Sequence, residues 1–460
     1  MAEDLITEEL LEDDDYALDR DTVEPILAAL REGDSEALAK LLDPIHPADI
    51  ADLLEQVDED TRIRLVQLYG MEFDGEILSE LNEGIRESII AALHPEVLAD
   101  AVRDLESDDV VDLIEDLDDP QRDIILDALA ATDRAAVEQS LAYPEESAGR
   151  LMQRELVAAP EHWDVGHVID HMRAHDDLPD QFYHVILVDP RMRPTGYVTL
   201  GKIMASPRTA KLTEIMEDSF RTIPVHQDEA EVAYAFNQYH LISAPVVDED
   251  DRLVGVITID DAMIILDEEL EEDILRLAGV GETSLTDRVR DTVRARLPWL
   301  GVNLVTAIIA SLVIAIFEDV IASFVALAVL MPIVASMGGN AGTQSLTVAV
   351  RAIATKDLTS SNLWRVIRRE AAVGLINGAV FALVMGLVGV VWFGTWMLAG
   401  VIAAAMVINL LVAGLSGVLV PVLLERLKVD PALASGTFVT TVTDVVGFFA
   451  FLGLAGIVLL

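Results

Sequence analysis

The sequence contains no cysteine. That absence excludes disulfide bonds, thiolate metal sites and cysteine nucleophiles. The 9 histidines are scattered, and none forms the His-Glu-x-x-His pattern of a zinc protease. Phosphate-binding loops of the full Gly-x-x-x-x-Gly-Lys-Ser/Thr type and Gly-x-Ser-x-Gly elbows are also missing, since the run Gly196-Tyr-Val-Thr-Leu-Gly-Lys202 is followed by Ile203. The protein is therefore not expected to be an enzyme, and any transport is expected to follow ion gradients rather than ATP hydrolysis.

Basic residues are also scarce, because 31 Lys and Arg stand against 80 Asp and Glu, for a net charge of −49. Residues 298–460 hold seven residues of each sign, so residues 1–297 carry the whole excess. Such a surface repels nucleic acid and attracts divalent cations, whose preferred ligands are carboxylate oxygens. For any single carboxylate the alternative is a solvated acidic face, which salt adaptation also produces.

The first part of the chain has helical periodicity and an internal repeat. Its opening Met-Ala-Glu-Asp-Leu is acidic and lacks an apolar run, which predicts no cleaved signal peptide. Residues 1–20 are expected to form an acidic lead-in and residues 21–143 a helical N-domain. Residues 49–62 match residues 109–122 at an offset of 60, with apolar residues at helical spacing in both. Repeated helix pairs of this kind predict a small solenoid; the alternative is a generic helical interaction domain.

Residues 144–265 alternate strand-like and helical runs and contain a second repeat. Residues 188–199 match residues 247–258 at an offset of 59, and each copy reads as strand, turn, strand and helix start. This pattern resembles a tandem pair of CBS modules, which fold as one α/β unit and act as regulatory sensors.

The CBS resemblance raises the question of a nucleotide ligand such as ATP. The positions that match Thr258 and Asp261 can hold a nucleotide ribose and phosphate in CBS modules. The first copy has Lys202 where that aspartate would stand, so at most one such site is intact. The alternative is that Thr258 simply caps a helix.

Residues 266–297 are predicted to form a connecting helix, rich in carboxylates at first and then in arginines. It leads into a membrane domain at residues 298–460. Five apolar stretches there are each long enough to cross a bilayer. They are residues 298–317, 320–349, 371–393, 396–424 and 431–458.

The basic residues of the membrane domain predict its orientation. Arginines precede the first stretch, and basic residues also follow the second and the fourth, whereas the other two links contain none. By the positive-inside rule, the N-terminus is then cytosolic and the C-terminus external.

Two features interrupt the apolar stretches. Pro332 and the run Gly338-Gly339-Asn340 suggest a broken or closely packed helix, with Asn340 lining a pore. The alternative is close helix packing through glycine alone. Asp444 is the only ionisable residue of the last stretch, about 21 Å along a helix from Asp430. A carboxylate at this depth needs water, a cation or a partner, and no basic side chain of a stretch is available to pair with it.

At this point the chain resembles MgtE-type Mg²⁺ channels along nearly its full length. The motifs that carry the resemblance are Tyr143-Pro-Glu-Glu-Ser-Ala-Gly-Arg-Leu-Met152, Gly338-Gly-Asn-Ala-Gly-Thr-Gln344, Val429-Asp-Pro-Ala-Leu433 and Thr441-Val-Thr-Asp444. The implied fold is multi-domain: an α-helical solenoid, an α/β tandem CBS domain, an acidic connecting helix and an all-α five-helix transmembrane domain.

The resemblance also implies partners and site residues. It implies a homodimer in a bacterial inner membrane, with the pore between the subunits. Asp444 matches a pore aspartate that holds hydrated Mg²⁺, helped by the backbone carbonyl of Thr440, and Asn340 matches a pore-side asparagine. The positions implied to bind regulatory Mg²⁺ are Glu272, Asp273 and Asp430 at the inner mouth, and Asp261 and Glu269 facing the N-domain.

The predicted function is therefore a Mg²⁺ channel that cytosolic Mg²⁺ closes by bridging carboxylates of the cytosolic domains. Two positions depart from the family pattern: Ile264 stands where some members have an acidic residue, and Gly436 where some have asparagine. Two alternatives remain, namely transport of another divalent cation such as Mn²⁺ or Co²⁺, and a membrane-anchored ion or nucleotide sensor that conducts nothing.

Overall fold

The computed structural model describes residues 18–460 except 116, 118, 176–177, 180, 218–219 and 281–288. Most of the predicted acidic lead-in therefore lies outside the described residues. The chain divides into two compact units, residues 1–266 and 267–460, and each is described by itself below.

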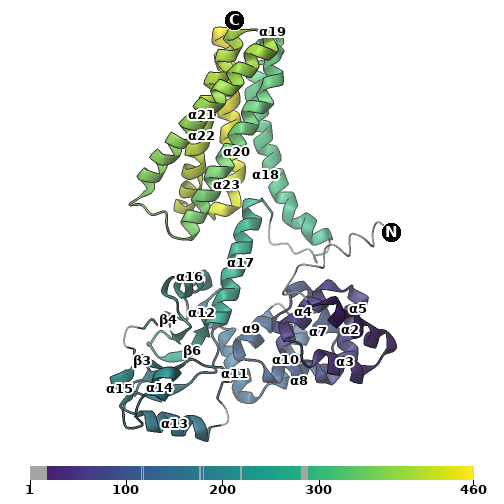
Figure 1. Ribbon diagram of the computed structural model, residues 1–460, viewed down its shortest axis with the longest axis vertical. Coiled ribbons are helices and arrows are strands. Elements are labelled where there is room, and N and C mark those ends of the chain that lie inside the picture. The colour runs from purple at the N-terminus through teal and green to yellow at the C-terminus, as the bar shows by residue number, and fades with distance from the viewer. Residues whose placement is uncertain are drawn as a thin grey trace. The chain divides into compact units, whose positions relative to one another are not determined.

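The N-domain is entirely helical within its described residues (Figure 1). Its core consists of aliphatic side chains spaced three or four residues apart, such as Leu38 and Leu42, both fully buried. Its elements are α2 (Arg20–Glu32), α3 (Ser35–Leu42), α4 (Pro47–Gln56), α5 (Glu59–Tyr69), η1 (Gly70–Glu72), α6 (Glu76–Ser79), α7 (Glu83–Ala92), α8 (Pro95–Ala101), η2 (Val102–Asp104), α9 (Ser107–Glu115), α10 (Asp119–Ala128) and α11 (Ala131–Ser140).

The predicted 60-residue repeat is present as two helix pairs, α4–α5 and α9–α10. In the first pair a buried arginine joins the helices, because Arg62 of α5 donates to the carbonyl oxygens of Leu54 (2.7 Å) and Val57 (3.1 Å). Histidine and proline open two helices: His46 and His94 are N-cap residues, each followed by proline at the first helical position.

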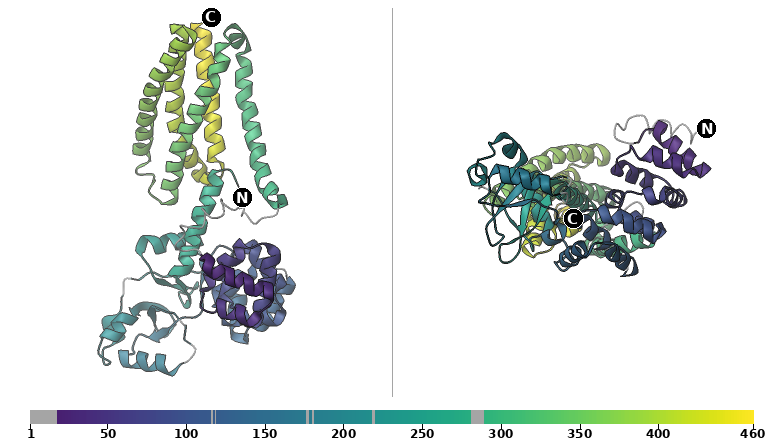
Figure 2. Two further views of the ribbon diagram at one scale, coloured as in Figure 1. Left: turned by 45° about the vertical axis from the view of Figure 1, so that its right-hand side comes forward. Right: turned by 90° about the horizontal axis from the view of Figure 1, so that it is seen from below.

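The CBS pair contains two three-stranded sheets, in the orders β1-β2-β3 and β4-β5-β6 (Figure 2). The 59-residue repeat holds in detail. Strands β2 and β3 pair antiparallel from His184↔Thr199, and strands β5 and β6 pair antiparallel from Ser243↔Thr258. Each hairpin has a bulge at the same place, near the end of its first strand. The elements are α12 (Ala148–Leu151), β1 (Ala158–Pro160), α13 (Val165–Ala174), β2 (His184–Val188), β3 (Pro194–Thr199), α14 (Leu200–Ala205), α15 (Leu212–Ile215), β4 (Ile223–Pro224), α16 (Glu229–Tyr239), β5 (Ser243–Val247) and β6 (Leu253–Thr258).

The predicted connecting helix is not one element. Helix α17 (Ile259–Leu277) begins at the end of β6 and stops at Leu277, and Gly279 adopts a left-handed backbone with φ of 70°. Residues 281–288 lie outside the described residues. The next described helix, α18 (Val289–Ile316), begins before Pro298 and carries that proline inside it.

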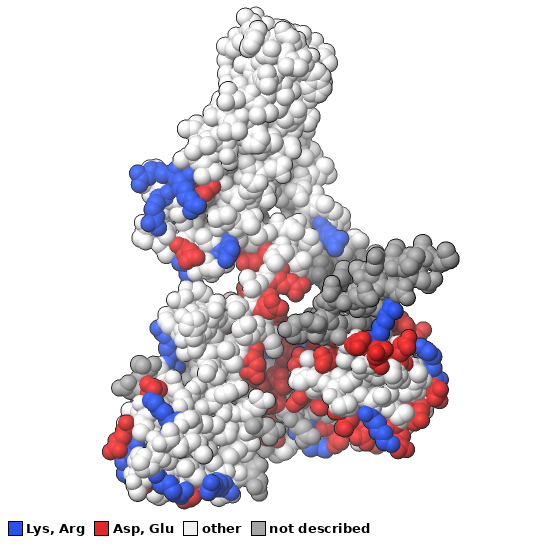
Figure 3. All heavy atoms as spheres, in the orientation of Figure 1, with Lys and Arg blue, Asp and Glu red and all other residues white. Residues whose placement is uncertain are grey.

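Among its described residues, the second unit has five helices long and apolar enough to cross a membrane, as predicted. On the face that Figure 3 draws, no charged side chain is visible at the end of this bundle that carries the C-terminus. The second span starts later than predicted, because the short α19 (Glu318–Ser323) takes up the residues after the first span. The spans are α18, α20 (Ala326–Ala354), α21 (Leu363–Phe393), α22 (Trp396–Arg426) and α23 (Pro431–Val458).

Helix α20 is continuous through its glycine run, so of the two predicted arrangements the structure shows the closely packed helix and not the broken one. Its glycines instead allow close approach of neighbouring helices. A Cβ on Gly338 would lie 2.2 Å from Asn409 Nδ2 of α22, and one on Gly342 would lie 2.6 Å from Val439 of α23. Asn409 is fully buried and donates to the carbonyl oxygen of Val334 at 2.8 Å.

This packing gives the first prediction. Gly338→Val should destabilise the membrane domain by about 1–3 kcal/mol, because the added methyl groups overlap the Asn409 amide. The matched control is Gly400→Val, since nothing lies within 4 Å of a Cβ at Gly400 of α22. The thermal midpoint of the detergent-purified chain checks this, and equal midpoints for the two variants would contradict it.

Candidate functional site

The predicted nucleotide residues form a helix cap at the start of α17. The Asp261 carboxylate oxygen Oδ2 accepts from both the backbone N–H and the hydroxyl of Thr258. In the first CBS copy the arrangement differs, because the Thr199 hydroxyl accepts from the backbone N–H of Lys202 at 3.2 Å. The Lys202 ammonium pairs with Glu217 instead. Thr258 and Asp261 are therefore bonded to each other as a helix cap.

Asp261 also belongs to a group of carboxylates shared by the N-domain and the CBS pair. These residues, called the interdomain carboxylates below, lie at the beginnings of α9 and α17. Desolvation is the main cause that raises the pKa of Asp109, to about 7, and the charge of Asp261 comes next. Burial likewise raises the pKa of Asp261 to about 6, although its bond from Thr258 opposes the shift. The group is Glu106, Asp108, Asp109, Asp260 and Asp261.

Two further members of the group, Glu106 and Asp108, show the same effect. Burial raises the pKa of Glu106 to about 7, and the charge of Glu155 adds to the shift. The buried Asp108 has a pKa well above its usual range, chiefly from desolvation and then from the charge of Asp261. Like charges crowded away from water favour protons, and for the same reason they favour a cation.

The interdomain carboxylates are the right kind of ligand for a divalent cation, but their side chains are not arranged around one common point. Carboxylate oxygens are the ligands that Mg²⁺ and Ca²⁺ prefer. Among the described residues, however, no three acidic or histidine side chains are close enough together to hold one ion. Glu269 lies eight residues beyond Asp261 on α17, about 12 Å along the helix, and is separate from the group. Ile264 is exposed and contributes no ligand.

A second predicted group lies where the end of α17 contacts α23. Here Arg276 pairs with Glu272 on its own helix and with Asp430, whose Oδ2 is 2.9 Å from Arg276 Nη1. Asp430 is also the N-cap of α23 and accepts from the backbone N–H of Ala432 at 2.8 Å. Burial raises the pKa of Asp273, and the charge of Asp430 adds to the shift. The three predicted carboxylates therefore come together, with an arginine between two of them.

The predicted pore residues lie on two packed helices. Thr440 and Asp444 stand one turn apart on α23, and the Thr440 carbonyl oxygen accepts from the Thr443 hydroxyl at 2.9 Å. On α20, Asn340 is exposed and donates to the carbonyl oxygen of Ser336 at 2.9 Å. A Cβ on Gly339 would lie 3.5 Å from the Thr440 methyl group. The contact between α20 and α23 is therefore next to Asn340 and one turn from Asp444.

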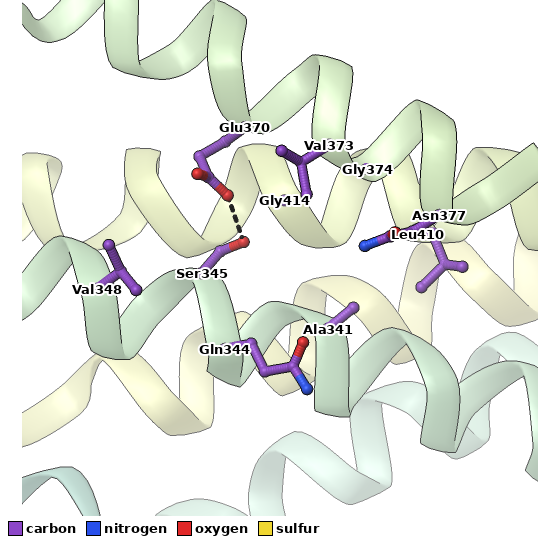
Figure 4. Close-up of a pocket in the computed structure, with 10 residues that line it drawn as sticks. All are labelled: Ala341, Gln344, Ser345, Val348, Glu370, Val373, Gly374, Asn377, Leu410 and Gly414. Carbon is purple, nitrogen blue, oxygen red and sulfur yellow. Dashed lines mark hydrogen bonds between the residues drawn. The ribbon is translucent and has the colours of Figure 1, made fainter.

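Three residues that matter in the structure were not singled out from the sequence. Asn409 and Arg276 are described above. The third is Glu370 of α21, which lies one residue before the predicted third span. Its carboxylate accepts from the Ser345 hydroxyl of α20 at 2.9 Å and borders a cavity of about 110 Å³ between α20, α21 and α22 (Figure 4). An acidic residue at the edge of an apolar stretch was the available signal.

Comparisons with known proteins agree with this arrangement. Residues 331–454 match the divalent cation transporter family MgtE, residues 45–146 match the MgtE intracellular N domain, and residues 148–207 and 212–268 match CBS domains. The chain is 35% identical to the magnesium transporter MgtE of Thermus thermophilus, over 94% of this chain and 97% of that protein. The chain belongs to the MgtE family.

Two further similarities support the MgtE assignment. The chain is 28% identical to the magnesium transporter MgtE of Bacillus subtilis, over 94% of this chain and 96% of that protein. A crystal structure of the cytosolic domain of the Mg²⁺ channel MgtE in complex with ATP matches 53% of this chain and 99% of that one, at 30% identity and a TM-score of 0.50. This member of the MgtE family is thus a multi-pass membrane protein with an N-domain and a CBS pair.

The raised pKa values predict how stability depends on pH. Folding raises the pKa of Glu106, Asp109 and Asp261 from about 4 to about 6 or 7. Between pH 4 and 7 the folded state therefore holds more protons than the unfolded state, and the free energy of unfolding falls as pH rises. In Mg²⁺-free buffer, the thermal midpoint of the cytosolic part of the full chain should fall from pH 5 to pH 8.

Asp109→Asn should flatten this pH dependence, because it removes one of the crowded charges. Asp123→Asn on α10 is the matched control, since Asp123 is exposed. Calorimetry at several pH values measures both variants. A midpoint that rises with pH, or an equal flattening in the control, contradicts the assignment.

Proposed function

We propose that this protein transports Mg²⁺ into the cell as a channel whose pore is lined by Asp444. The observation that carries the proposal is a carboxylate in the middle of the last membrane-spanning helix, next to the α20–α23 contact. The relatives named as magnesium transporters support Mg²⁺ as the ion. A hydrated Mg²⁺ suits the site, because this ion gives up its waters reluctantly and is commonly held through them.

The pore requires a second copy of the chain. Asp444 and Thr440 are partly exposed and Asn340 is exposed on the bundle of a single chain. A carboxylate facing lipid at this depth is costly, whereas two copies related by a twofold axis place their α23 helices across a water-filled path. We therefore propose a homodimer with the pore between the subunits.

The proposed orientation places the N-domain and the CBS pair in the cytosol. Arg351 and Lys356 end α20 and begin the following loop, and Arg426 and Lys428 stand at the end of α22. Both sets belong inside by the positive-inside rule. The C-terminus then lies outside the inner membrane of a bacterium, and the acidic domains face the cytosolic Mg²⁺ pool.

Gating follows from the charge of the cytosolic domains. At low Mg²⁺ the ionised interdomain carboxylates repel one another, and the N-domain and the CBS pair separate. At high Mg²⁺ divalent cations reduce this repulsion and favour the packed arrangement. High Mg²⁺ likewise favours contact between the connecting helix and the last span, because it reduces the repulsion among Glu272, Asp273 and Asp430. The ion shifts this equilibrium only by its differential affinity for the packed state.

ATP is the proposed nucleotide ligand of the CBS pair, at Thr258 and Asp261. The related cytosolic domain that was crystallised with ATP supports the nucleotide. In this chain one Asp261 oxygen already accepts two bonds from Thr258, so a ribose hydroxyl has to bind the other oxygen or displace Thr258.

The decisive test is Mg²⁺ uptake in cells that lack their own Mg²⁺ transporters. Asp444→Asn and Asp444→Ala should each reduce uptake at least about tenfold. The pore then loses the negative charge that compensates the ion for the bulk water it leaves. Asp357→Asn, in the loop between α20 and α21, is the control at equal membrane expression.

The outcomes separate the alternatives. Unchanged uptake in both Asp444 variants moves the pore elsewhere. If the wild type takes up Mn²⁺ or Co²⁺ in preference to Mg²⁺ in a competition assay, the transported ion is another divalent cation. Absence of uptake at both low and high cytosolic Mg²⁺ favours a sensor that does not conduct.

Arg276 should raise the Mg²⁺ concentration at which the channel closes, because its guanidinium occupies two carboxylates proposed to bind Mg²⁺. Arg276→Gln should lower the Mg²⁺ midpoint of closure roughly fivefold or more, as expected for loss of a charge-assisted pair. Patch-clamp recording over a Mg²⁺ titration measures the midpoint.

Two further variants make the Arg276 test specific. Arg276→Lys keeps the charge without the planar fork and should lie between wild type and Arg276→Gln. Arg426→Gln, at the end of α22, controls for loss of a basic residue near the inner mouth. A channel that no longer closes in Arg276→Gln would show that the arginine holds the closed state instead.

A further inference from the structure

Glu370 is a carboxylate at the inner edge of the membrane domain. It lies in the second turn of α21, directly after three arginines, at positions 365, 368 and 369. Those arginines place this turn at the cytosolic headgroup level in the proposed orientation. Within the described residues, the ion pairs include neither Glu370 nor these arginines, and the polar contact of Glu370 is the Ser345 hydroxyl at 2.9 Å.

The cavity beside Glu370 is polar at its rim and apolar behind. Gln344 of α20 and Asn377 of α21 bring two amide groups to it, while Val373 and Leu410 form apolar wall (Figure 4). Its volume of about 110 Å³ exceeds what a single water requires. Gln344 and Asn377 are exposed on the bundle surface. The cavity therefore opens sideways, in the direction from which a lipid approaches.

Two glycines allow α21 and α22 to pack closely beside the cavity, which limits its size. A Cβ on Gly414 of α22 would lie 2.9 Å from the Glu370 carbonyl oxygen, and one on Gly374 of α21 would lie 2.6 Å from the Leu410 carbonyl oxygen. Helices α21 and α22 thus contact through their backbones immediately behind the Glu370 side chain. The carboxylate is held against the buried Ser345 of α20, and both residues line the cavity.

The charges of this site fit a zwitterionic ligand. A carboxylate with amide oxygens nearby accepts hydrogen bonds from a primary ammonium group, and arginine binds phosphate through parallel N–H donors. The two signs stand within two turns of one helix without pairing with each other. Figure 3 shows the basic side chains gathered at the beginning of α21. The three arginines that precede Glu370 repel a divalent cation and attract phosphate, so a ligand that carries both signs fits this site better than a metal ion.

We infer that this cavity binds the headgroup of an aminophospholipid, with the ammonium of phosphatidylethanolamine at Glu370 and its phosphate at the arginines that precede it. The acyl chains then lie along the apolar surface of α20 and α21. Occupation of the site joins α20, α21 and α22, so the lipid stabilises the membrane domain. This binding is independent of the ion that the channel carries.

The test uses the full chain in nanodiscs of phosphatidylethanolamine, phosphatidylcholine or phosphatidylglycerol with identical acyl chains. Phosphatidylcholine keeps the positive charge but has no N–H donor, and phosphatidylglycerol has no ammonium. We expect phosphatidylethanolamine to be retained in native mass spectrometry with about tenfold preference over the other two. The thermal midpoint should also be highest in the phosphatidylethanolamine discs.

Glu370→Gln should abolish this preference while retention of phosphatidylglycerol stays unchanged, because the arginines remain. Glu425→Gln, at the exposed end of α22, is the matched control and should keep it. Ser345→Ala removes the hydroxyl that competes for the carboxylate, so it should retain the preference even if Glu370→Gln folds poorly.

Three results overturn the proposal. Equal retention of the three lipids by the wild type shows that the ammonium is not recognised. A preference that survives in Glu370→Gln, with its midpoint in phosphatidylglycerol unchanged, places the ammonium elsewhere. Stabilisation by Mg²⁺ alone that is lost in Glu370→Gln makes the cavity a cation site.

Discussion

Repulsion between carboxylates that are partly removed from water is the constraint on which this protein depends. Asp108 and Asp109 lie at the start of α9 and Asp261 at the start of α17. Burial raises the pKa of all three, and the charge of Asp261 raises the pKa of Asp108 and Asp109 further. In the proposed gating, packing of the N-domain against the CBS pair therefore depends on protons or cations from solution. A protein that responds to a cation needs this instability, since a surface with its charges already paired would not respond.

The membrane domain is held together by a different interaction. Lipid is as apolar as leucine, so the helices gain little from burying aliphatic side chains and depend on close packing instead. Asn409 is central to that packing: its amide contacts Gly338 of α20 and Gly447 of α23, and bonds the Val334 carbonyl. The α20–α23 contact that positions Asp444 is thus a consequence of small residues on three helices.

Periodicity and repeats predicted most of the fold from the sequence. The 60- and 59-residue offsets located the paired helices and the paired hairpins, because repeated segments adopt the same local structure. The glycine run of α20 was ambiguous, since glycine both breaks helices and lets them pack, and only the position of Asn409 on α22 decides between the two. Arg276 and Glu370 were missed for a similar reason: their partners, Asp430 and Ser345, are distant in sequence.

Arg276 shows why a list of carboxylates does not define a cation site. Its guanidinium lies between Glu272 and Asp430, so these groups are already neutralised by a cation that is part of the chain. A free ion can bind there only by displacing the arginine. The interdomain group consists of carboxylates alone, so an ion does not have to displace a basic member of that group. If both groups respond to Mg²⁺, they should therefore respond at different concentrations, the interdomain group first. That order follows from the position of one basic side chain rather than from the number of acidic ones.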